Sequence, residues 1–339
     1  MNRRVAFADV ARSALPDVPT LPVLHDLGLI RVSRQAMATT FEIALPAGTP
    51  DAVAAASSAL DVIEDVEEVL TVYRDHSEVS QLNATAFDEP MEVSVMLLDL
   101  LNLCGPLVQL TDGAFDPASG ALVKAWGFYK RAGRVPAAEE LAVARSASGF
   151  RHVLLDAERR TVKFLRRGLE LNFGSIGKGF ALDLAAKHLS AVWGIQTALL
   201  HGGGSSAYAL GVPPGHPHGW PIRLKHPHDP RRSLGTIHLA DAGLGVSAAT
   251  YQSFVHAGKS YGHVIDPRTG LPSAGTACAA VTARSAATAD ALSTAAFVLG
   301  PAKAEAVLET VSGSSSVLLP DGKDAQPRHK GDAVRPVRG

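Results

Sequence analysis

The stretch KGFALDLAAKHLSAVWGIQTALLHGGG, residues 178–204, decides the fold class. Its first half places apolar residues at helical spacing as far as Gly194, and a glycine at that point is typical of a helix end. The apolar run after Gly194 predicts a strand that ends in three glycines. Helices and strands continue on both sides without a regular strand–helix–strand rhythm. The pattern therefore favours an α+β fold over a doubly wound α/β fold.

The segments around this stretch repeat the same mixture of elements. Helices are expected over residues 50–72, 93–111, 287–300 and 301–313, and a hairpin is expected over 152–165. We expect a loosely held N-terminal arm over 1–30 and one folded domain over 31–320. The low apolar content of residues 321–339 predicts a flexible tail.

Composition excludes several classes of protein. The chain has 339 residues and a net charge of −1, with acids and bases mixed, so no basic stripe predicts a nucleic-acid partner. Cys104 and Cys278 lie far apart in apolar surroundings, which favours buried thiols over a disulfide and excludes a cysteine zinc site. No apolar run is long enough for a membrane span.

The first twenty residues bear on location. They contain two arginines but neither the apolar run of a signal peptide nor a cysteine that could carry a lipid. We therefore expect a cytoplasmic protein, or a periplasmic one if the true start of the chain lies elsewhere.

Residues 174–179, GSIGKG, invite comparison with a phosphate loop. The Walker pattern fails, because Asn172 stands where it needs glycine and Gly179 where it needs serine or threonine. The chemistry of the segment still suits an anion, since glycines permit close approach, Lys178 offers a cation and a helix begins here. The alternative is a glycine-rich turn with a solvated lysine.

Two further motifs are weak on their own. HGGG at 201–204 is similar to an esterase oxyanion loop, but the chain lacks the G-x-S-x-G nucleophile motif, so its glycines are expected to let a strand end pass close to a bulky group. HPH occurs at 216–218 and at 226–228, and the prolines favour exposed loops over a histidine metal site.

Asp290 and Thr294 are separated by four residues in the expected helix 287–300. This spacing places a carboxylate and a hydroxyl on one helical face. Two such oxygens form a sensible half-site for Mg²⁺, which takes its other ligands from water and phosphate. The alternative is a carboxylate that is favoured only by the helix dipole.

Together these segments resemble the FAD:protein FMN transferases, the ApbE-like flavin transferase family. The matching blocks are collinear and cover roughly residues 33–300. They read MATTFEI, YRDHSEVSQLN, GAFDPASG followed by WGF, NFGSIGKGFALD, HGGG, GVSAATYQSF, GHVIDPRTGLP and TADALSTAAFVLG. HVIDPRTG and DALST are the most specific of them.

The resemblance implies mixed helices and mostly antiparallel sheets in a T-fold-related architecture, with the active site between two lobes. It also implies a reaction that needs Mg²⁺ as cofactor and FAD as substrate. A threonine hydroxyl of an acceptor protein attacks the FMN-side phosphorus, FMN becomes attached to the threonine, and AMP leaves. The acceptor would carry a motif similar to Asp-Gly-x-Ser/Thr-Gly-Ala-Thr.

The resemblance also assigns residues. Asp290, Thr294 and Ser175 are expected to bind Mg²⁺. The positions expected to contact FAD are Met37, Tyr73, Ala114, Phe115, Asp116, Asn172, Lys178 and Ile265. His263 is our candidate base, because a threonine hydroxyl is a weak nucleophile and imidazole titrates near neutrality. Asp266 would orient His263 or the loop. A structural role for His263 is the alternative.

The chain departs from the family at two places. Asn172 stands where the family usually has aspartate, so a charge is lost. Ser247-Ala248-Ala249-Thr250 replaces a Ser-Thr-Ser-Gly segment and removes a hydroxyl and a glycine. Two other functions therefore stay open, an FAD pyrophosphatase that releases FMN and AMP and a non-catalytic FAD-binding protein.

Overall fold

The computed structural model describes residues 28–130, 132–249 and 253–336. Most of the expected N-terminal arm, residues 1–27, lies outside the described residues. Within them, β1 begins at Leu29, at the end of the range expected for the arm.

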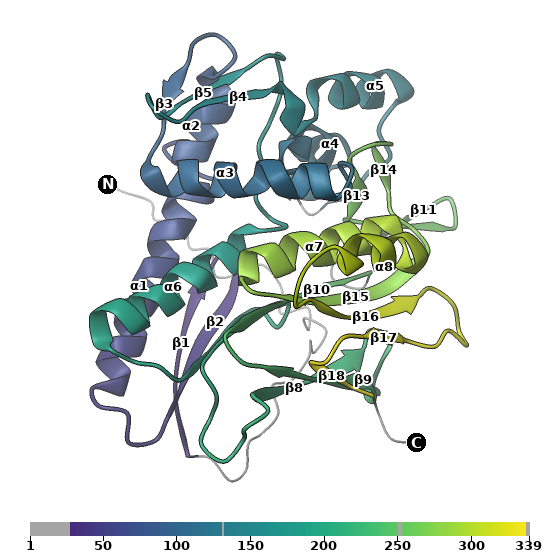
Figure 1. The fold of residues 1–339 in the computed structure, drawn as a ribbon. Coiled ribbons are helices and arrows are strands. Elements are labelled where there is room, and N and C mark those ends of the chain that lie inside the picture. Colours follow the sequence, from purple (N-terminus) through teal and green to yellow (C-terminus); the bar gives the residue numbers. More distant parts are fainter. Residues whose placement is uncertain (1–27, 131, 250–252, 337–339) are drawn as a thin grey trace, which may run out of the picture.

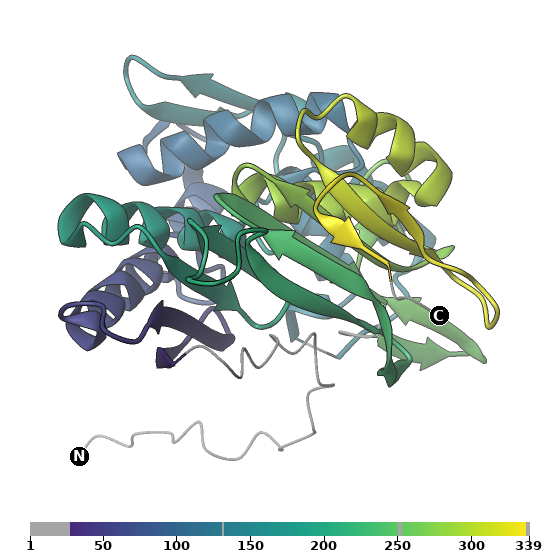
Figure 2. The ribbon, with the colours of Figure 1, turned by 60° about the horizontal axis from the view of Figure 1, so that its bottom comes forward.

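An eight-stranded sheet forms the centre of the molecule (Figure 1). All of its strand pairs are antiparallel, which agrees with the predicted fold class. In spatial order its strands are β1 (Leu29–Ala36), β2 (Thr39–Pro46), β6 (Ala198–Gly202), β7 (Ser206–Leu210), β10 (Ala242–Ala248), β15 (Thr276–Ala283), β16 (Ser315–Pro320) and β17 (Arg328–Lys330). Figure 2 shows the sheet from below, with β1 and β2 at one end and β16 and β17 at the other.

Helices cover one face of this sheet. They are α1 (Ala52–Leu70), α6 (Gly177–Trp193), α7 (Ala286–Leu299) and α8 (Pro301–Glu309). The helix predicted from the stretch 178–194 is confirmed, and Gly194 ends it in the left-handed conformation. The three glycines after it also behave as expected: a Cβ at Gly202 would lie 2.5 Å from the ring of Phe41, so this strand end passes a bulky side chain closely.

A second, three-stranded sheet covers the other face. It consists of β8 (Trp220–His226), β9 (Asp229–Leu239) and β18 (Val334–Arg335). Trp220 and Ile237 form a separate apolar cluster with residues of the large sheet. The prediction of a flexible tail over 321–339 is wrong for the described part of that segment, because β17 pairs with β16 and β18 pairs with β9, while Val334 is buried in the cluster.

The chain between α1 and α6 forms the upper part of Figure 1. Its helices are α2 (Glu78–Thr85), α3 (Val95–Leu110), α4 (Gly120–Ala125) and α5 (Ala138–Ala147), with short 3-10 turns at Pro117–Ser119, Phe128–Lys130 and Phe150–His152. Its strands are β3 (Met91–Glu92), β4 (Val153–Asp156) and β5 (Thr161–Phe164), and β4 with β5 confirms the predicted hairpin.

Two small ribbons complete the fold. One pairs β11 (Ser253–His256) with β12 (Lys259–Gly262), and the other pairs β13 (Ile265–Asp266) with β14 (Leu271–Pro272). His263 stands between the two ribbons in the chain. Both cysteines are free and buried, as expected. No helix in the described part of the chain is long and apolar enough to cross a membrane.

Candidate active site

Asp290 lies in the second turn of α7, where nearly every residue is buried. Its side chain is 5% exposed, and its Oδ2 atom accepts hydrogen bonds from the backbone N–H of Gly179 at 2.8 Å and from the hydroxyl of Ser206 at 2.9 Å. Both bonds use Oδ2, so Oδ1 remains available as a ligand for a cation.

The contact between α6 and α7 requires a glycine at position 179. A Cβ there would lie 2.2 Å from the carbonyl oxygen of Ala286, so any side chain would force the helices apart. Because the amide of Gly179 can approach α7 this closely, it reaches the Asp290 carboxylate. The glycine-rich segment thus serves helix packing, which the sequence did not indicate.

Burial and a nearby cation have opposite effects on the protonation of Asp290. Burial raises the pKa of this carboxyl to about 7, while the ammonium group of Lys178 acts in the opposite direction. Hydroxyl groups lie around it: Ser293 Oγ is 3.0 Å from Ser247 Oγ, which is 3.4 Å from Thr294 Oγ1. A carboxylate with neighbouring hydroxyls is a donor set that a hard divalent cation accepts.

Asp183 of α6 fixes the start of α7. Its two carboxylate oxygens accept the backbone N–H groups of Ala286 and Ala287 at 2.7 and 2.9 Å. These N–H groups belong to the first turn of α7, which has no intrahelical acceptors for them. Burial raises the pKa of Asp183 to about 6. The sequence analysis missed this residue, although the NFGSIGKGFALD block ends on it.

A second group of polar residues surrounds Tyr129. Asn172 donates its side-chain N–H to the Tyr129 hydroxyl at 3.1 Å and accepts from the backbone N–H of Gly174 at 2.9 Å. Tyr73 meets the ring of Tyr129 edge-on, with centroids 6.0 Å apart, and is 70% exposed. Tyr73 thus presents an open ring face on which a planar group can stack. Tyr129 was missed, although it directly follows the WGF motif.

The segment Ala114-Phe115-Asp116 is more deeply packed than its expected role suggests. The side chains of Ala114 and Phe115 are buried in the main core. The Asp116 carboxylate accepts the backbone N–H groups of Ala118 at 2.8 Å and of Phe150 at 3.0 Å. Burial raises its pKa. Any contact of Ala114 and Phe115 with a nucleotide would therefore use their main chain.

His263 lies beside a cluster of aromatic rings. Its ring meets Phe128 edge-on, with centroids 6.4 Å apart. Tyr261 stacks on Phe254 at 5.3 Å and also contacts Trp126 at 5.5 Å. This cluster anchors the β11–β12 ribbon directly before His263.

Ile265 and Asp266 both contact other protein side chains that the sequence did not indicate. The Ile265 side chain is buried among Leu122, Trp126 and other apolar residues, so it does not face an open pocket. Asp266 binds the guanidinium of Arg268 through both of its oxygens, at 2.9 and 2.8 Å. This pairing favours the alternative in which Asp266 orients the loop and not the imidazole.

The remaining predicted positions lie in turns. Met37 occupies the turn between β1 and β2, with a positive φ of 49° and a half-buried side chain that packs against the main core. Ser175 lies half-exposed in the turn before α6. The HPH histidines belong to no group of three or more His, Cys, Asp or Glu placed to hold an ion among the described residues.

Comparison with protein families shows to which family this chain belongs. The ApbE family model matches residues 37–319, which is most of the chain and includes every predicted site residue. The chain belongs to the ApbE family.

Curated relatives of this ApbE chain share one name. The FAD:protein FMN transferase of Treponema pallidum is 31% identical over 280 residues, which cover 78% of this chain and 77% of the relative. The FAD:protein FMN transferase of Haemophilus influenzae is 32% identical over 256 residues, 73% of each chain. These relationships confirm the prediction of a transferase.

Solved ApbE structures share the fold. The ApbE protein of Thermotoga maritima superimposes with a TM-score of 0.80 at 27% identity, covering 88% of this chain and 97% of that structure. The flavin transferase ApbE of Vibrio cholerae gives a TM-score of 0.78 at 27% identity, covering 90% and 97%. The α+β class predicted from the sequence is therefore confirmed.

Proposed function

We propose that this ApbE-family chain transfers the FMN moiety of FAD to a threonine hydroxyl of an acceptor protein, with Mg²⁺ as cofactor and AMP as the second product. One observation carries the proposal: Asp290 is a buried carboxylate held between the amide of Gly179 and the hydroxyl of Ser206, beside the ammonium group of Lys178. Chemistry at a pyrophosphate needs such a place, where a metal and a cation meet the phosphate oxygens.

The residues around Asp290 fit Mg²⁺. The ion would be held by Asp290 Oδ1, by the hydroxyl of Thr294 and by an oxygen of Ser175, with phosphate oxygens and water as further ligands. A bound Mg²⁺ would polarise the pyrophosphate and neutralise the charge that develops on it. It would also replace the proton that burial favours on Asp290, since burial is the main cause that raises the pKa of this carboxyl to about 7.

The FAD contacts that we propose come from three parts of the chain. Lys178 would face the phosphates, and the exposed ring of Tyr73 would stack on a planar ring of FAD. Asn172 would donate to FAD with the amide that now bonds to Tyr129. Met37, the main chain of Ala114 to Asp116 and the main chain of Ile265 would complete the contacts. The Asn172 amide supplies hydrogen bonds but no charge. The electrostatic attraction for the phosphates would therefore come from neighbouring cations such as Lys178.

The transfer itself balances as a substitution at phosphorus. The threonine oxygen forms a bond to the FMN-side phosphorus, and the bond from that phosphorus to the bridging oxygen breaks. AMP leaves with that oxygen. His263 accepts the threonine proton, while Asp266 and Arg268 hold the turn that follows it.

Assay of both products tests this proposal. The full chain is mixed with FAD, Mg²⁺ and a peptide that carries a motif similar to Asp-Gly-x-Ser/Thr-Gly-Ala-Thr. Mass spectrometry follows the peptide and chromatography follows AMP. We expect one flavinylated peptide per AMP released, no reaction after EDTA treatment, and no modification of a peptide in which the target threonine is valine.

Other outcomes would replace the proposal. AMP and free FMN without a modified peptide would make the chain an FAD pyrophosphatase. Bound FAD without either product would make it an FAD-binding protein that does not turn over.

A further inference from the structure

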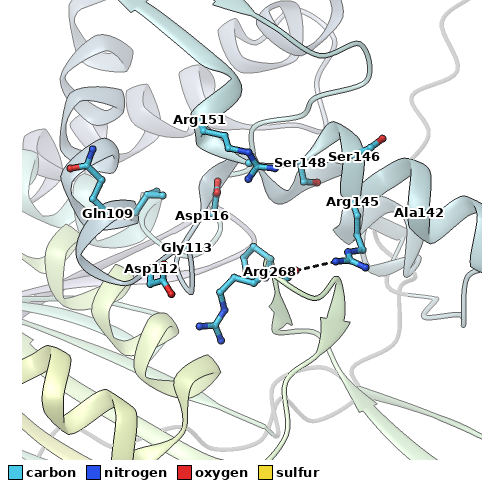
Figure 3. A pocket seen from close by; sticks show the side chains of 13 residues that line it. Gln109, Asp112, Gly113, Asp116, Ala142, Arg145, Ser146, Ser148, Arg151 and Arg268 are labelled. Atoms are coloured by element: carbon cyan, nitrogen blue, oxygen red, sulfur yellow. Dashed lines mark hydrogen bonds between the residues drawn. The ribbon is translucent and has the colours of Figure 1, made fainter.

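A cavity of about 830 Å³ lies between α3, α5 and the turn that joins β13 to β14 (Figure 3). Among the residues that line it, Asp116 and Arg268 have roles in the proposed flavin transfer. Three arginines from separate elements line the space: Arg145 from α5, Arg151 from the 3-10 turn Phe150–His152, and Arg268 from the β13–β14 turn, whose guanidinium points away from the other two in Figure 3.

Two of these arginines are fixed in place by their neighbours. Arg268 makes the paired contact with Asp266 described above, which sets the plane of its guanidinium. Arg145 donates to the backbone carbonyl oxygen of Arg268 at 3.3 Å. The two side chains are thus ordered before any ligand arrives, which lowers the entropic cost of binding one.

Arg151 lies beside a glycine. A Cβ at Gly149 would lie 2.6 Å from Arg151 Nη1, the end of a flexible side chain that could move aside, so the backbone conformation and not the guanidinium favours glycine here. The φ of Gly149 is 116°, a conformation that other residues rarely adopt. Among the described residues, neither Arg151 nor Arg145 forms an ion pair with a carboxylate.

The two acids of the cavity form no ion pair with Arg145 or Arg151 among the described residues. Burial raises the pKa of Asp116, and the nearby charge of Arg151 acts against this shift. The oxygens of Asp116 accept three hydrogen bonds from the backbone N–H groups of Ala118 and Phe150. Asp112 is exposed to water at the rim. Arg145 and Arg151 therefore face the same space with donors that no carboxylate of the described residues occupies.

We propose that this cavity binds a small organic anion that carries a carboxylate or phosphate group, at a site separate from that of FAD. Guanidinium groups recognise both kinds of oxyanion through paired hydrogen bonds. The volume lies within the range of about 300–1,000 Å³ that is typical of small-molecule sites. The guanidinium groups of Arg145 and Arg151, which form no ion pair with a described carboxylate, would donate these hydrogen bonds.

Calorimetry on the full chain, without FAD or Mg²⁺, tests the site with two probes. Citrate supplies carboxylates alone, and inorganic pyrophosphate supplies phosphates alone. We expect at least one of them to bind saturably, and we expect Arg151→Gln and Arg145→Gln each to weaken that binding roughly tenfold, as for a lost charged hydrogen bond. The matched control is Arg159→Gln, which removes an equal charge from an exposed turn outside the cavity.

Saturating FAD separates this site from the flavin site. We expect the affinity for the probe to stay the same when FAD is bound, and Arg151→Gln to leave FAD affinity unchanged. Displacement of the probe by FAD would overturn the proposal, because the cavity would then belong to the nucleotide site. No saturable binding at millimolar probe, or equal weakening by Arg159→Gln, would overturn it as well. Arg151→Lys keeps the charge and controls for general effects of a substitution at this position. Thermal unfolding checks that each variant is folded.

Discussion

The surroundings of Asp290 and those of His263 are built in opposite ways. Asp290 lies on a buried helix that contacts α6 directly and is held by the amide of Gly179 and by Ser206. His263 lies between two short ribbons, which are fixed by aromatic contacts and by the pairing of Asp266 with Arg268. Isolated two-stranded ribbons are marginally stable, whereas buried helices open only when the protein unfolds.

This difference matches the tasks proposed for the two regions. A metal and a pyrophosphate need ligands that do not move, because electrostatic stabilisation depends on fixed geometry. An acceptor protein must approach and leave, so the residue that takes its proton benefits from a looser support. Four sets of substitutions test whether the two regions differ in this way.

Asp290→Ala should have the largest effect. Removal of the carboxylate takes away the proposed metal ligand, and we expect the rate of AMP release to fall by about 10³-fold or more. Asp99→Ala, which removes an exposed carboxylate from α3, should keep wild-type activity. Full Mg²⁺-dependent activity in Asp290→Ala, measured with folding verified by circular dichroism, would exclude this residue as a metal ligand.

His263→Ala should lower turnover by about 10²–10⁴-fold, the usual contribution of a general base. We expect the dissociation constant of FAD to change far less, since the loss concerns the nucleophile. His256→Ala, on the ribbon that precedes His263, is the matched control. Equal losses in turnover and in FAD affinity would make His263 a binding residue. Both regions would then serve to bind FAD.

The pH dependence of stability should reveal the buried charge. The pKa of Asp290 in the folded chain, about 7, exceeds the value of about 3.9 for an unfolded chain, so the folded form binds more protons between these pH values. Without metal, the free energy of unfolding should therefore fall by a few kcal/mol as pH rises from about 4 to 7 because of this group.

Asp290→Asn should remove that contribution. Denaturant unfolding in EDTA should show the variant gaining stability relative to wild type between pH 5 and pH 8. Saturating Mg²⁺ should stabilise the wild type, by about 2.7 kcal/mol at a hundredfold excess over its dissociation constant, and leave the variant unaffected. Parallel pH curves for the two proteins would contradict the charge state that we assign to Asp290.

A pair of glycine substitutions compares the rigidity of the two regions. Gly179→Ala inserts a methyl group against the backbone of Ala286 and should lower the free energy of unfolding by about 1–3 kcal/mol. Gly262→Ala, directly before His263, meets no atom within 4 Å and should change it by less than about 0.5 kcal/mol. Denaturant titration measures both, and similar losses would mean that the ribbon is packed as tightly as the helix pair.

The sequence predicted the regular parts of this molecule well. Apolar spacing identified α6 and its end at Gly194, and alternation identified the β4–β5 hairpin. These elements depend on local pattern, which a single sequence contains. The family blocks likewise contained the residues that meet at the α6–α7 contact, among them Lys178 and Asp290.

The failures concern contacts that the local sequence pattern does not indicate. The strands β17 and β18 are short and, apart from Val334, polar, and they form because β16 and β9 offer them free edges. No local pattern indicates that Tyr129 bonds to Asn172 or that Ile265 is buried beneath its turn. Asp266 lies two residues from Arg268, yet their pairing depends on the turn that brings the two side chains together.

The large sheet also constrains how the chain reaches its folded state. Strand β2 pairs with β6, although residues 47–197 lie between them, and those residues form α1, α6 and the whole upper part of the molecule. The pairing of β2 with β6 can therefore form only after the chain has returned to β2. Closure of such a loop costs entropy that grows slowly with its length, while the rate of folding falls as contacts become more distant in sequence. We expect the ladder between β2 and β6 to form late, after the helices of residues 47–197 have packed together.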